Sequence, residues 1–138
     1  MSEASFEKPL PEPTKGSAPF WDGLKAHKLV LQRCAQCKKL RHYPRPMCDA
    51  CHSMEAEWVE GSPKGKVYSW MVAHHAFHPG FKRDLPYIVL TVDMQDGVRI
   101  AAPMAGADSS RLALGHSVTL DFERVNDDIT LPRFSLDD

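Results

Sequence analysis

The chain has 138 residues, and its 17 basic and 18 acidic side chains leave a formal net charge of −1. That length suits one ordinary domain or two small ones that share a boundary, and a hydrophobic fraction of 43% is sufficient for a core. The balanced charge argues against nucleic acid, whose binding proteins usually carry a basic face; no apolar run approaches the ~18 residues of a transmembrane helix.

The N-terminal part of the chain predicts a tail followed by a short helix. Residues 1–17 are polar and proline-rich and show no periodicity, so we expect a disordered tail. It does not resemble a signal peptide, and the expected compartment is the cytoplasm. Ser17 can cap an amphipathic helix over about Pro19–Ala26. Phe20 and Trp21 are bulky for so short a helix, and they pack either on the chain's own core, which we favour, or on another protein as interface anchors.

Two closely spaced cysteine pairs follow a short strand, Leu29–Leu31. They hold all the cysteines of the chain, namely Cys34, Cys37, Cys48 and Cys51. Each C-x2-C pair can form a tight turn that aims two thiolates at one point, and two such turns supply the tetrahedral sulfur ligands that Zn²⁺ prefers. Because four thiolates leave no open position for water, we expect one structural zinc ion rather than a catalytic one.

Other interpretations of the cysteines stay open at this point. Two disulfides would need an oxidising compartment, four free thiols are conceivable, and four thiolates also accept iron. His42 and His52 lie close to the cysteines, but four sulfurs complete the tetrahedron, so we expect both at the surface or behind the ligands. Arg41 and Arg45 are more typical of a solvated ribbon than of a phosphate site, and Trp58 is expected to pack on the strands of the ribbon.

The turn-forming segment 61–65 is the predicted boundary between the ribbon, residues 18–60, and a second domain, residues 61–138. Beyond it the hydrophobic period is two, and Asp96-Gly97 favours a hairpin. The expected strands are Lys66–His74, Tyr87–Asp93, Val98–Ala102, Val118–Glu123 and Ile129–Phe134. Apolar residues on both faces of the first strand predict burial on both sides or curling within a barrel. A mainly β fold with a five-stranded barrel of the OB type fits this count.

A histidine-rich segment separates the first two strands of the barrel. It contains His74, His75, Phe77, His78, Pro79, Gly80 and Phe81. Three imidazoles could bind a catalytic metal or supply a general base. However, adjacent strand residues point to opposite sides, and the segment has no carboxylate to orient an imidazole. We therefore favour a loop whose aromatic side chains cover a groove or contact a partner.

The chain contains no recognisable catalytic motif. It has no G-x-S-x-G, no Walker loop and no glycine-rich dinucleotide fingerprint. Since the cysteines are assigned to metal and the carboxylates are scattered, the protein is poorly equipped to act as an enzyme alone.

Short blocks along the whole chain resemble the domain-of-unknown-function family thirty-five (DUF35). The similarity covers about residues 18–136, and one departure is Lys38, where the family commonly has glycine. The matching blocks are Phe20-Trp21-Asp22-Gly23-Leu24, Leu31-Gln32-Arg33-Cys34, Arg45-Pro46-Met47-Cys48, Gly65 to Trp70, His75 with Pro79-Gly80-Phe81, Leu85-Pro86-Tyr87, and Leu131 to Phe134.

The resemblance implies an N-terminal helix, a rubredoxin-like zinc ribbon and a C-terminal OB-fold. It further implies a subunit that binds thiolase-like enzymes, including sterol-carrier-type thiolases and aldolases of steroid side-chain degradation, or a MaoC-like hydratase. In such complexes the ribbon and the OB-fold help to enclose the CoA arm of an acyl-CoA substrate. For partner or substrate-channel contact we single out Phe20, Trp21, Trp70, His74, His75, Phe77, His78, Pro79, Gly80 and Phe81.

Two other functions remain as alternatives. Zinc ribbons and OB-folds also bind single-stranded nucleic acid by stacking bases on aromatic side chains, for which Tyr68, Trp70 and Arg99 are candidates, although we expect no binding. Independent thioester hydrolysis by His75 or His78 would require turnover by the isolated protein, and it is the least favoured of the three.

Overall fold

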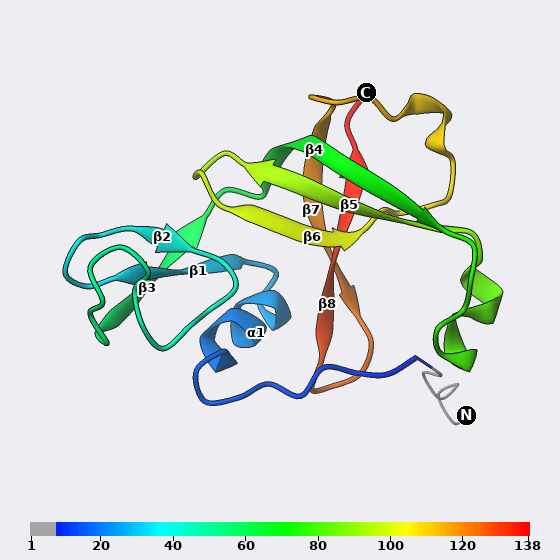
Figure 1. The fold of residues 1–138 in the computed structure, drawn as a ribbon. Coiled ribbons are helices and arrows are strands. Elements are labelled where there is room, and N and C mark those ends of the chain that lie inside the picture. Colours follow the sequence, from blue (N-terminus) through cyan, green and yellow to red (C-terminus); the bar gives the residue numbers. More distant parts are fainter. Residues whose placement is uncertain (1–7) are drawn as a thin grey trace.

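The computed structural model describes residues 8–138 and is mainly β, with one α-helix, a three-stranded ribbon and a five-stranded barrel (Figure 1). This agrees with the predicted architecture. The elements are α1 (Ala18–Lys25), β1 (Leu29–Cys34), β2 (Leu40–Arg41), β3 (Ala56–Gly61), β4 (Lys64–Ala73), the 3-10 helix η1 (Pro79–Asp84), β5 (Tyr87–Met94), β6 (Arg99–Pro103), the 3-10 helix η2 (Ser109–Arg111), β7 (Ser117–Arg124) and β8 (Thr130–Leu136).

Helix α1 begins one residue before the predicted start. Ser17 occupies the N-cap position, but its side chain does not cap the helix; instead its Oγ accepts a hydrogen bond from the Thr14 amide at 3.0 Å. Phe20 and Leu24 face inward and are buried, at 3% and 0% exposure. The predicted tail lies partly outside the described residues, and residues 8–17 contain no strand and no helix before α1.

The ribbon is a small antiparallel sheet in the order β2-β1-β3. The predicted strand Leu29–Leu31 is the first half of β1, which runs directly into Cys34. β1 pairs with β3 along its full length, from Leu29 opposite Gly61 to Cys34 opposite Ala56. The first cysteine is therefore held at the end of a paired strand, which fixes its position.

The barrel strands are hydrogen-bonded in the order β6-β5-β4-β7-β8. A parallel bridge between Met104 and Phe134 brings β8 back to the chain just after β6, so the sheet is nearly closed. The inward residues alternate along each strand as predicted: Ile88, Leu90 and Val92 of β5 are all fully buried.

Burial of β4 differs from the prediction. Val67 and Ala73 are buried, but Tyr68 is 50% exposed, Met71 51% and Val72 37%. Of the two predicted alternatives, burial on both sides is not observed, whereas β4 does lie within the nearly closed barrel. The reason is tertiary: β7 pairs with β4 only over residues 64–66, so the rest of β4 has a neighbouring strand on the β5 side alone.

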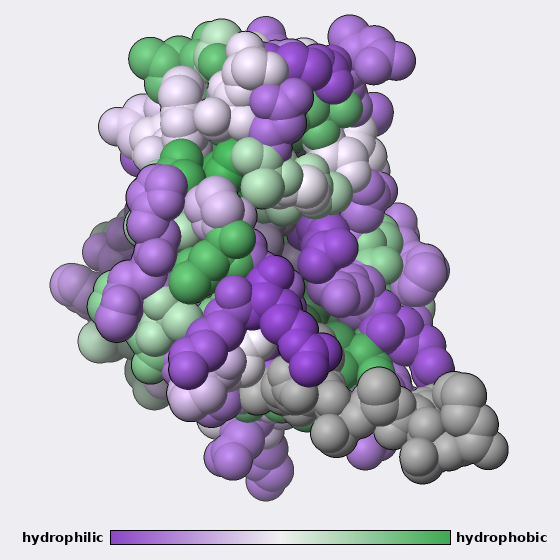
Figure 2. Space-filling model, turned by 90° about the vertical axis from the view of Figure 1, so that its right-hand side faces the viewer, coloured by the Kyte–Doolittle hydropathy of each residue, from purple (hydrophilic) through white to green (hydrophobic). Residues whose placement is uncertain are grey.

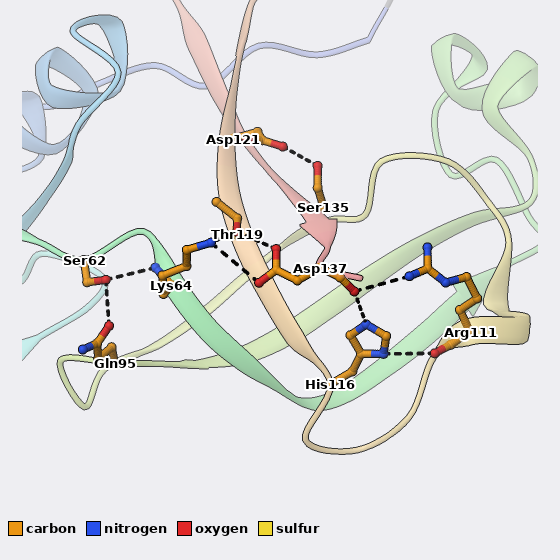
Figure 3. A network of polar contacts seen from close by, with 9 residues as sticks. All are labelled: Ser62, Lys64, Gln95, Arg111, His116, Thr119, Asp121, Ser135 and Asp137. Carbon is orange, nitrogen blue, oxygen red and sulfur yellow. Dashed lines mark hydrogen bonds and ion pairs between the residues drawn. The ribbon is translucent and has the colours of Figure 1, made fainter.

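A polar network fastens the C-terminal end of the barrel (Figure 3). The Thr119 hydroxyl donates to Asp137 Oδ1 at 2.7 Å, and Lys64 Nζ donates to the same Thr119 oxygen. His116 Nε2 lies 2.8 Å from the Asp137 carbonyl oxygen, and the Arg111 guanidinium donates to that oxygen. The contacts tie the segment after β8 to β4 and to the chain before β7.

One hydrophobic cluster joins all parts of the structure. It contains Phe20 and Leu24 of α1, Leu29 and Leu31 of β1, and the inward residues of the barrel strands. The helix and the ribbon are therefore packed on the barrel rather than attached by a free linker.

Within the described residues, no helix has the length and apolar character needed to cross a membrane.

Candidate functional site

The two cysteine turns converge on one point. The four Sγ atoms of Cys34, Cys37, Cys48 and Cys51 all lie within 4.8 Å of one another. Cys34 Sγ is 3.5 Å from Cys51 Sγ, and Cys37 Sγ is 3.6 Å from Cys48 Sγ. A disulfide needs about 2.05 Å, whereas sulfurs around one zinc at about 2.3 Å stand about 3.8 Å apart. The geometry fits a tetrahedral metal ion and rejects the disulfide alternative.

The two turns have the same backbone design. In both, the amide four residues after the first cysteine donates to the carbonyl of that cysteine, Lys38 to Cys34 at 3.0 Å and His52 to Cys48 at 2.9 Å. Amides also donate to the sulfurs at 3.4 Å, from Cys37 to Cys34 Sγ and from Ala50 to Cys48 Sγ. Each turn then closes through a left-handed residue, Lys38 with φ 67° and His52 with φ 65°. The glycine that the family commonly has at position 38 would suit this conformation, and lysine adopts it nonetheless.

The electrostatics of the sulfurs favour a bound cation. The hydrogen bond from the Cys37 amide is the main reason why the pKa of Cys34 falls to about 6. Amides of Cys51 and Ala50 likewise lower the pKa of Cys48. At Cys37 the Lys39 amide acts in the same direction, but desolvation and the neighbouring thiols outweigh it and raise the pKa to about 11. The raised pKa of Cys37 shows that a further negative charge is disfavoured here, and a bound cation would remove that cost.

Neighbouring ribbon residues have structural roles. Burial, followed by the charge of Arg45, lowers the pKa of His42 to about 4, and its ring packs 5.0 Å from that of Phe20. Arg41 is only 4% exposed and donates to Gln32 Oε1 at 2.6 Å and to the Arg45 carbonyl at 3.0 Å. Arg41 is thus neither solvated nor available to a phosphate group. His52 is exposed.

The two helix aromatics differ in surroundings. Phe20 lies in the chain's own core, as the favoured interpretation predicted. Trp21 is half-buried and donates from Nε1 to the Tyr43 hydroxyl at 2.9 Å. Its ring meets that of Phe20 edge-on, with centroids 5.1 Å apart. Trp21 is therefore partly accessible to a partner, whereas Phe20 is not.

The histidine-rich segment forms an exposed loop that ends in η1. His78 Nδ1 accepts a hydrogen bond from the Gly80 amide at 3.0 Å and so begins η1. His75 packs edge-on against Phe77, which is 81% exposed, and Phe81 stacks on Tyr87 at 5.4 Å. In residues 8–138 these histidines do not form a metal-binding group.

Exposed apolar side chains extend from this loop along β4. The predicted contact residues Trp70 and Phe77 are among them, and so are three residues that sequence reasoning missed, Tyr68, Met71 and Val72. Along the strand, Met71 points to the opposite side of the sheet from Trp70 and Val72. The three residues were missed because apolar residues on both faces of a strand indicated burial. The signal that could have found them is the lack of any charged residue between Val67 and Ala73, which is also typical of an interaction surface. Figure 2 looks at the end of the molecule where β4 runs into the loop, and green apolar groups there lie among purple polar ones.

A cavity of about 410 Å³ lies beside the loop. Phe81 and Tyr87 form one wall, and residues of β6 and β8, including Pro103 and Leu131, form others. Arg133 also lines it and pairs with Glu123 at 2.9 Å. The cavity is mostly apolar, and a second ion pair at its margin joins Lys8 Nζ to Asp84 Oδ2 at 2.7 Å.

The residues considered for nucleic acid do not form a free basic surface. Arg99 lies over the Tyr68 ring at 3.6 Å from its centroid, and its Nε donates to Asp93 at 2.7 Å. The charge of Arg99 is therefore neutralised where a phosphate would have to bind, and the guanidinium covers one face of the Tyr68 ring.

Comparison with known proteins places both domains. Residues 21–55 match the family described as the ChsH2 rubredoxin-like zinc ribbon domain, and residues 58–123 match the ChsH2 C-terminal OB-fold domain. A solved structure described as the Ltp2–ChsH2(DUF35) aldolase superposes with a TM-score of 0.81 at 37% identity, over 92% of this chain and 98% of that chain.

Two curated relatives show similar subunits. A probable enoyl-CoA hydratase alpha subunit of Thermomonospora curvata is 38% identical over 92% of this chain, but the chain spans only 39% of that relative's length. A benzoylsuccinyl-CoA thiolase subunit, BbsA, of Geobacter metallireducens is 32% identical over 86% of this chain and 74% of its own length.

Proposed function

This chain belongs to the ChsH2-type DUF35 family, and from that premise we propose that it is an accessory subunit of a thiolase-superfamily enzyme acting on acyl-CoA thioesters. The observation that carries the proposal is the likeness to the ChsH2(DUF35) component of an aldolase, which spans nearly that whole chain. The exposed apolar side chains between Tyr68 and Phe77 support it, because groups of such side chains mark interaction sites.

In this proposal the partner carries out the chemistry. Carbon–carbon bond cleavage or formation takes place in the partner's active site, and this chain contributes binding surface and helps to enclose the CoA arm. Trp21, Trp70 and the His74–Phe81 loop form the contact region, while the cavity beside Phe81 is the natural place for part of the acyl-CoA. A cytoplasmic location remains a prediction from the sequence.

The cysteine site holds structural zinc in this proposal. Elemental analysis of the purified chain should find one zinc per chain and a colourless protein, whereas a coloured iron protein would contradict the zinc assignment. Replacing Cys34 and Cys48, the two buried ligands, by serine should release the metal.

The decisive experiment is purification of the tagged chain from its own organism, with identification of the proteins that accompany it. We expect a thiolase-like protein in near-equal amount, and recombinant mixing of the two should reconstitute the complex and its acyl-CoA activity. A hydratase in place of the thiolase would move the proposal to the second partner class, which the Thermomonospora relative favours. If neither enzyme binds, even after crosslinking, the accessory role is wrong.

The loop assignment has its own test. Replacing Phe77, His78 and Phe81 together by alanine should weaken complex formation and lower the partner's activity at least tenfold, because each aromatic contributes apolar contact area. The control is Met54→Ala, which removes another exposed apolar side chain, 66% exposed, from the ribbon side of the molecule. Unchanged binding and activity in the triple variant would refute this role.

A further inference from the structure

Among the described residues, no strand lies beside the outer edge of β4 over most of its length. β4 pairs with β5 as far as Ala73, but with β7 only over residues 64–66. The next residue, Val67, is still satisfied on that side, since its amide donates to the His116 carbonyl and its carbonyl accepts from the Gly115 amide. From Tyr68 to Ala73, nothing in residues 8–138 pairs with this edge.

The register shows which backbone groups the free edge presents. The Met104 amide donates to the Ile88 carbonyl at 2.8 Å, so the backbone groups of Ile88 point toward β6. Because these groups alternate in antiparallel strands, those of Val89 point toward β4, where they meet Met71. The amides and carbonyls of Trp70 and Val72 consequently point away from β5 and out of the sheet.

The free edge lacks the features that normally protect sheet edges. Natural edges are blunted by charged residues, by proline or by short length, but residues 67–73 contain neither charge nor proline. A bulge at Tyr68 lies at one end only. A groove of about 810 Å³, lined by Tyr68 and Leu114, adjoins the beginning of the edge. Such an edge is a template for strand addition.

Positive side chains stand at both ends of the edge. Lys66 lies at its beginning, and exposed Lys82 and Arg83 of η1 follow its end, beyond His74 and His75. No ion pair engages Lys66, Lys82 or Arg83 within residues 8–138. If two copies of the chain paired their β4 edges in antiparallel fashion, centred on Met71, Lys66 of each copy would lie near the His74–Arg83 end of the other copy. Like charges therefore oppose self-association through this edge.

We propose that the free edge of β4 takes up an extended segment of the partner subunit, apolar in its middle and acidic at both ends, as an additional strand. Its backbone would pair with Trp70 and Val72, and its acidic ends would meet Lys66 and the Lys82–Arg83 pair. This inference rests on the proposed function, since the thiolase-like partner supplies the segment.

Amide hydrogen exchange tests the pairing directly. In the complex of the full chain with the thiolase-like partner, the amides of Trp70 and Val72 should exchange at least tenfold more slowly than in the free chain. The amides of Met71 and Ala73, which point toward β5, are the internal control and should change little. A stable complex in which Trp70 and Val72 exchange as before would overturn the proposal and leave the accessory role intact.

A synthetic peptide tests the edge without the partner. The probe alternates valine and threonine in its centre and carries two acidic residues at each end; its control carries lysines there instead. We expect the acidic peptide to bind the full chain at least tenfold more tightly, and Val72→Pro to weaken it tenfold by removing one outward amide.

Val72→Thr is the matched variant, since it keeps the amide and the branched side chain. Equal binding of both peptides, or no effect of Val72→Pro in a protein that unfolds at an unchanged midpoint, would contradict the proposal. A concentration-dependent dimer that Val72→Pro dissociates would instead identify a second copy as the occupant. If no thiolase-like partner is found but the acidic peptide binds at Trp70 and Val72, the proposed function fails and the edge site stands.

Discussion

At the residue scale, the cysteine turns place the greatest demand on the backbone. Each turn closes through a non-glycine residue with positive φ, Lys38 in one and His52 in the other. This conformation costs a residue with a side chain about 1–2 kcal/mol. The hydrogen bonds of the ribbon around the turns have to offset that cost.

Lys38→Gly should therefore stabilise the ribbon. Glycine adopts the left-handed conformation without strain, which stabilises the folded state. The larger chain entropy of glycine and the loss of the exposed ion pair with Glu57 offset part of this gain. The free energy of unfolding should rise by about 0.5–1 kcal/mol. Lys38→Ala is the control, because it removes the same ion pair but keeps the conformation, and it should not stabilise. Urea unfolding of the zinc-loaded proteins gives the comparison; equal stability of the two variants would argue against backbone strain.

His42 should make stability depend on pH. Its pKa is lowered from 6.5 to about 4, mainly by burial, so the unfolded chain takes up a proton first as the pH falls. The free energy of unfolding should accordingly drop between pH 6.5 and 4, by about 1–3 kcal/mol. His42→Phe keeps the aromatic packing on Phe20 and should lose this part of the slope. The wild-type protein and His42→Phe protonate their cysteines alike, so the difference between their pH profiles of stability isolates the contribution of His42. Parallel profiles would refute a contribution of His42 to the pH dependence.

At the element scale, the docking of α1 on β1 depends on one glycine. A Cβ at Gly23 would lie 2.4 Å from Val30 Cγ2 and 2.9 Å from Val30 Cβ. The helix can therefore approach the strand this closely only because position 23 has no side chain. This close approach lets Phe20 and Leu24 reach the common core.

Gly23→Ala should lower the free energy of unfolding by about 1–3 kcal/mol, since the helix must move away from the strand. Gly16→Ala, where a Cβ would meet nothing nearer than 3.9 Å, is the control and should stay within about 0.5 kcal/mol. Adding Val30→Ala to Gly23→Ala should restore part of the loss in a double-mutant cycle. Simple additivity of the two substitutions would show that the contact is not responsible.

At the scale of the whole molecule, the ribbon and the barrel share one hydrophobic cluster. Leu29 and Leu31 of the ribbon strand pack in the same core as the barrel residues Val92 and Val98. A boundary at residues 61–65 separates two types of sheet, but it does not separate two cores. The ribbon and the barrel should for this reason behave as one cooperative unit.

Removal of the metal should consequently destabilise the barrel as well as the ribbon. In a variant with Trp21→Phe and Trp58→Phe, the remaining Trp70 reports on β4 alone. A strong chelator should lower the urea midpoint seen by Trp70 fluorescence and by far-UV circular dichroism together, in a single transition. If the chelator left the urea midpoint of Trp70 fluorescence unchanged, the barrel would be stable without the metal.

The sequence by itself determined the cluster of four cysteines and the strands of the barrel. Cysteine spacing is a local signal, because a C-x2-C turn needs only its own residues, and the period of two along β5 and β7 records alternate burial directly. The helix was predicted to within one residue for the same reason: Ser17 and the aromatics that follow it are neighbours in the chain.

Only the tertiary structure decided which apolar residues are covered. Tyr68, Met71 and Val72 have the composition of a buried strand, yet they lie exposed because β7 departs from β4 after residue 66. Phe20 and Trp21 are adjacent in the sequence, but the position of the ribbon buries one and leaves surface on the other. Burial depends on the partners that a strand or helix meets across the chain, and hydrophobic periodicity carries no record of where a neighbouring strand ends.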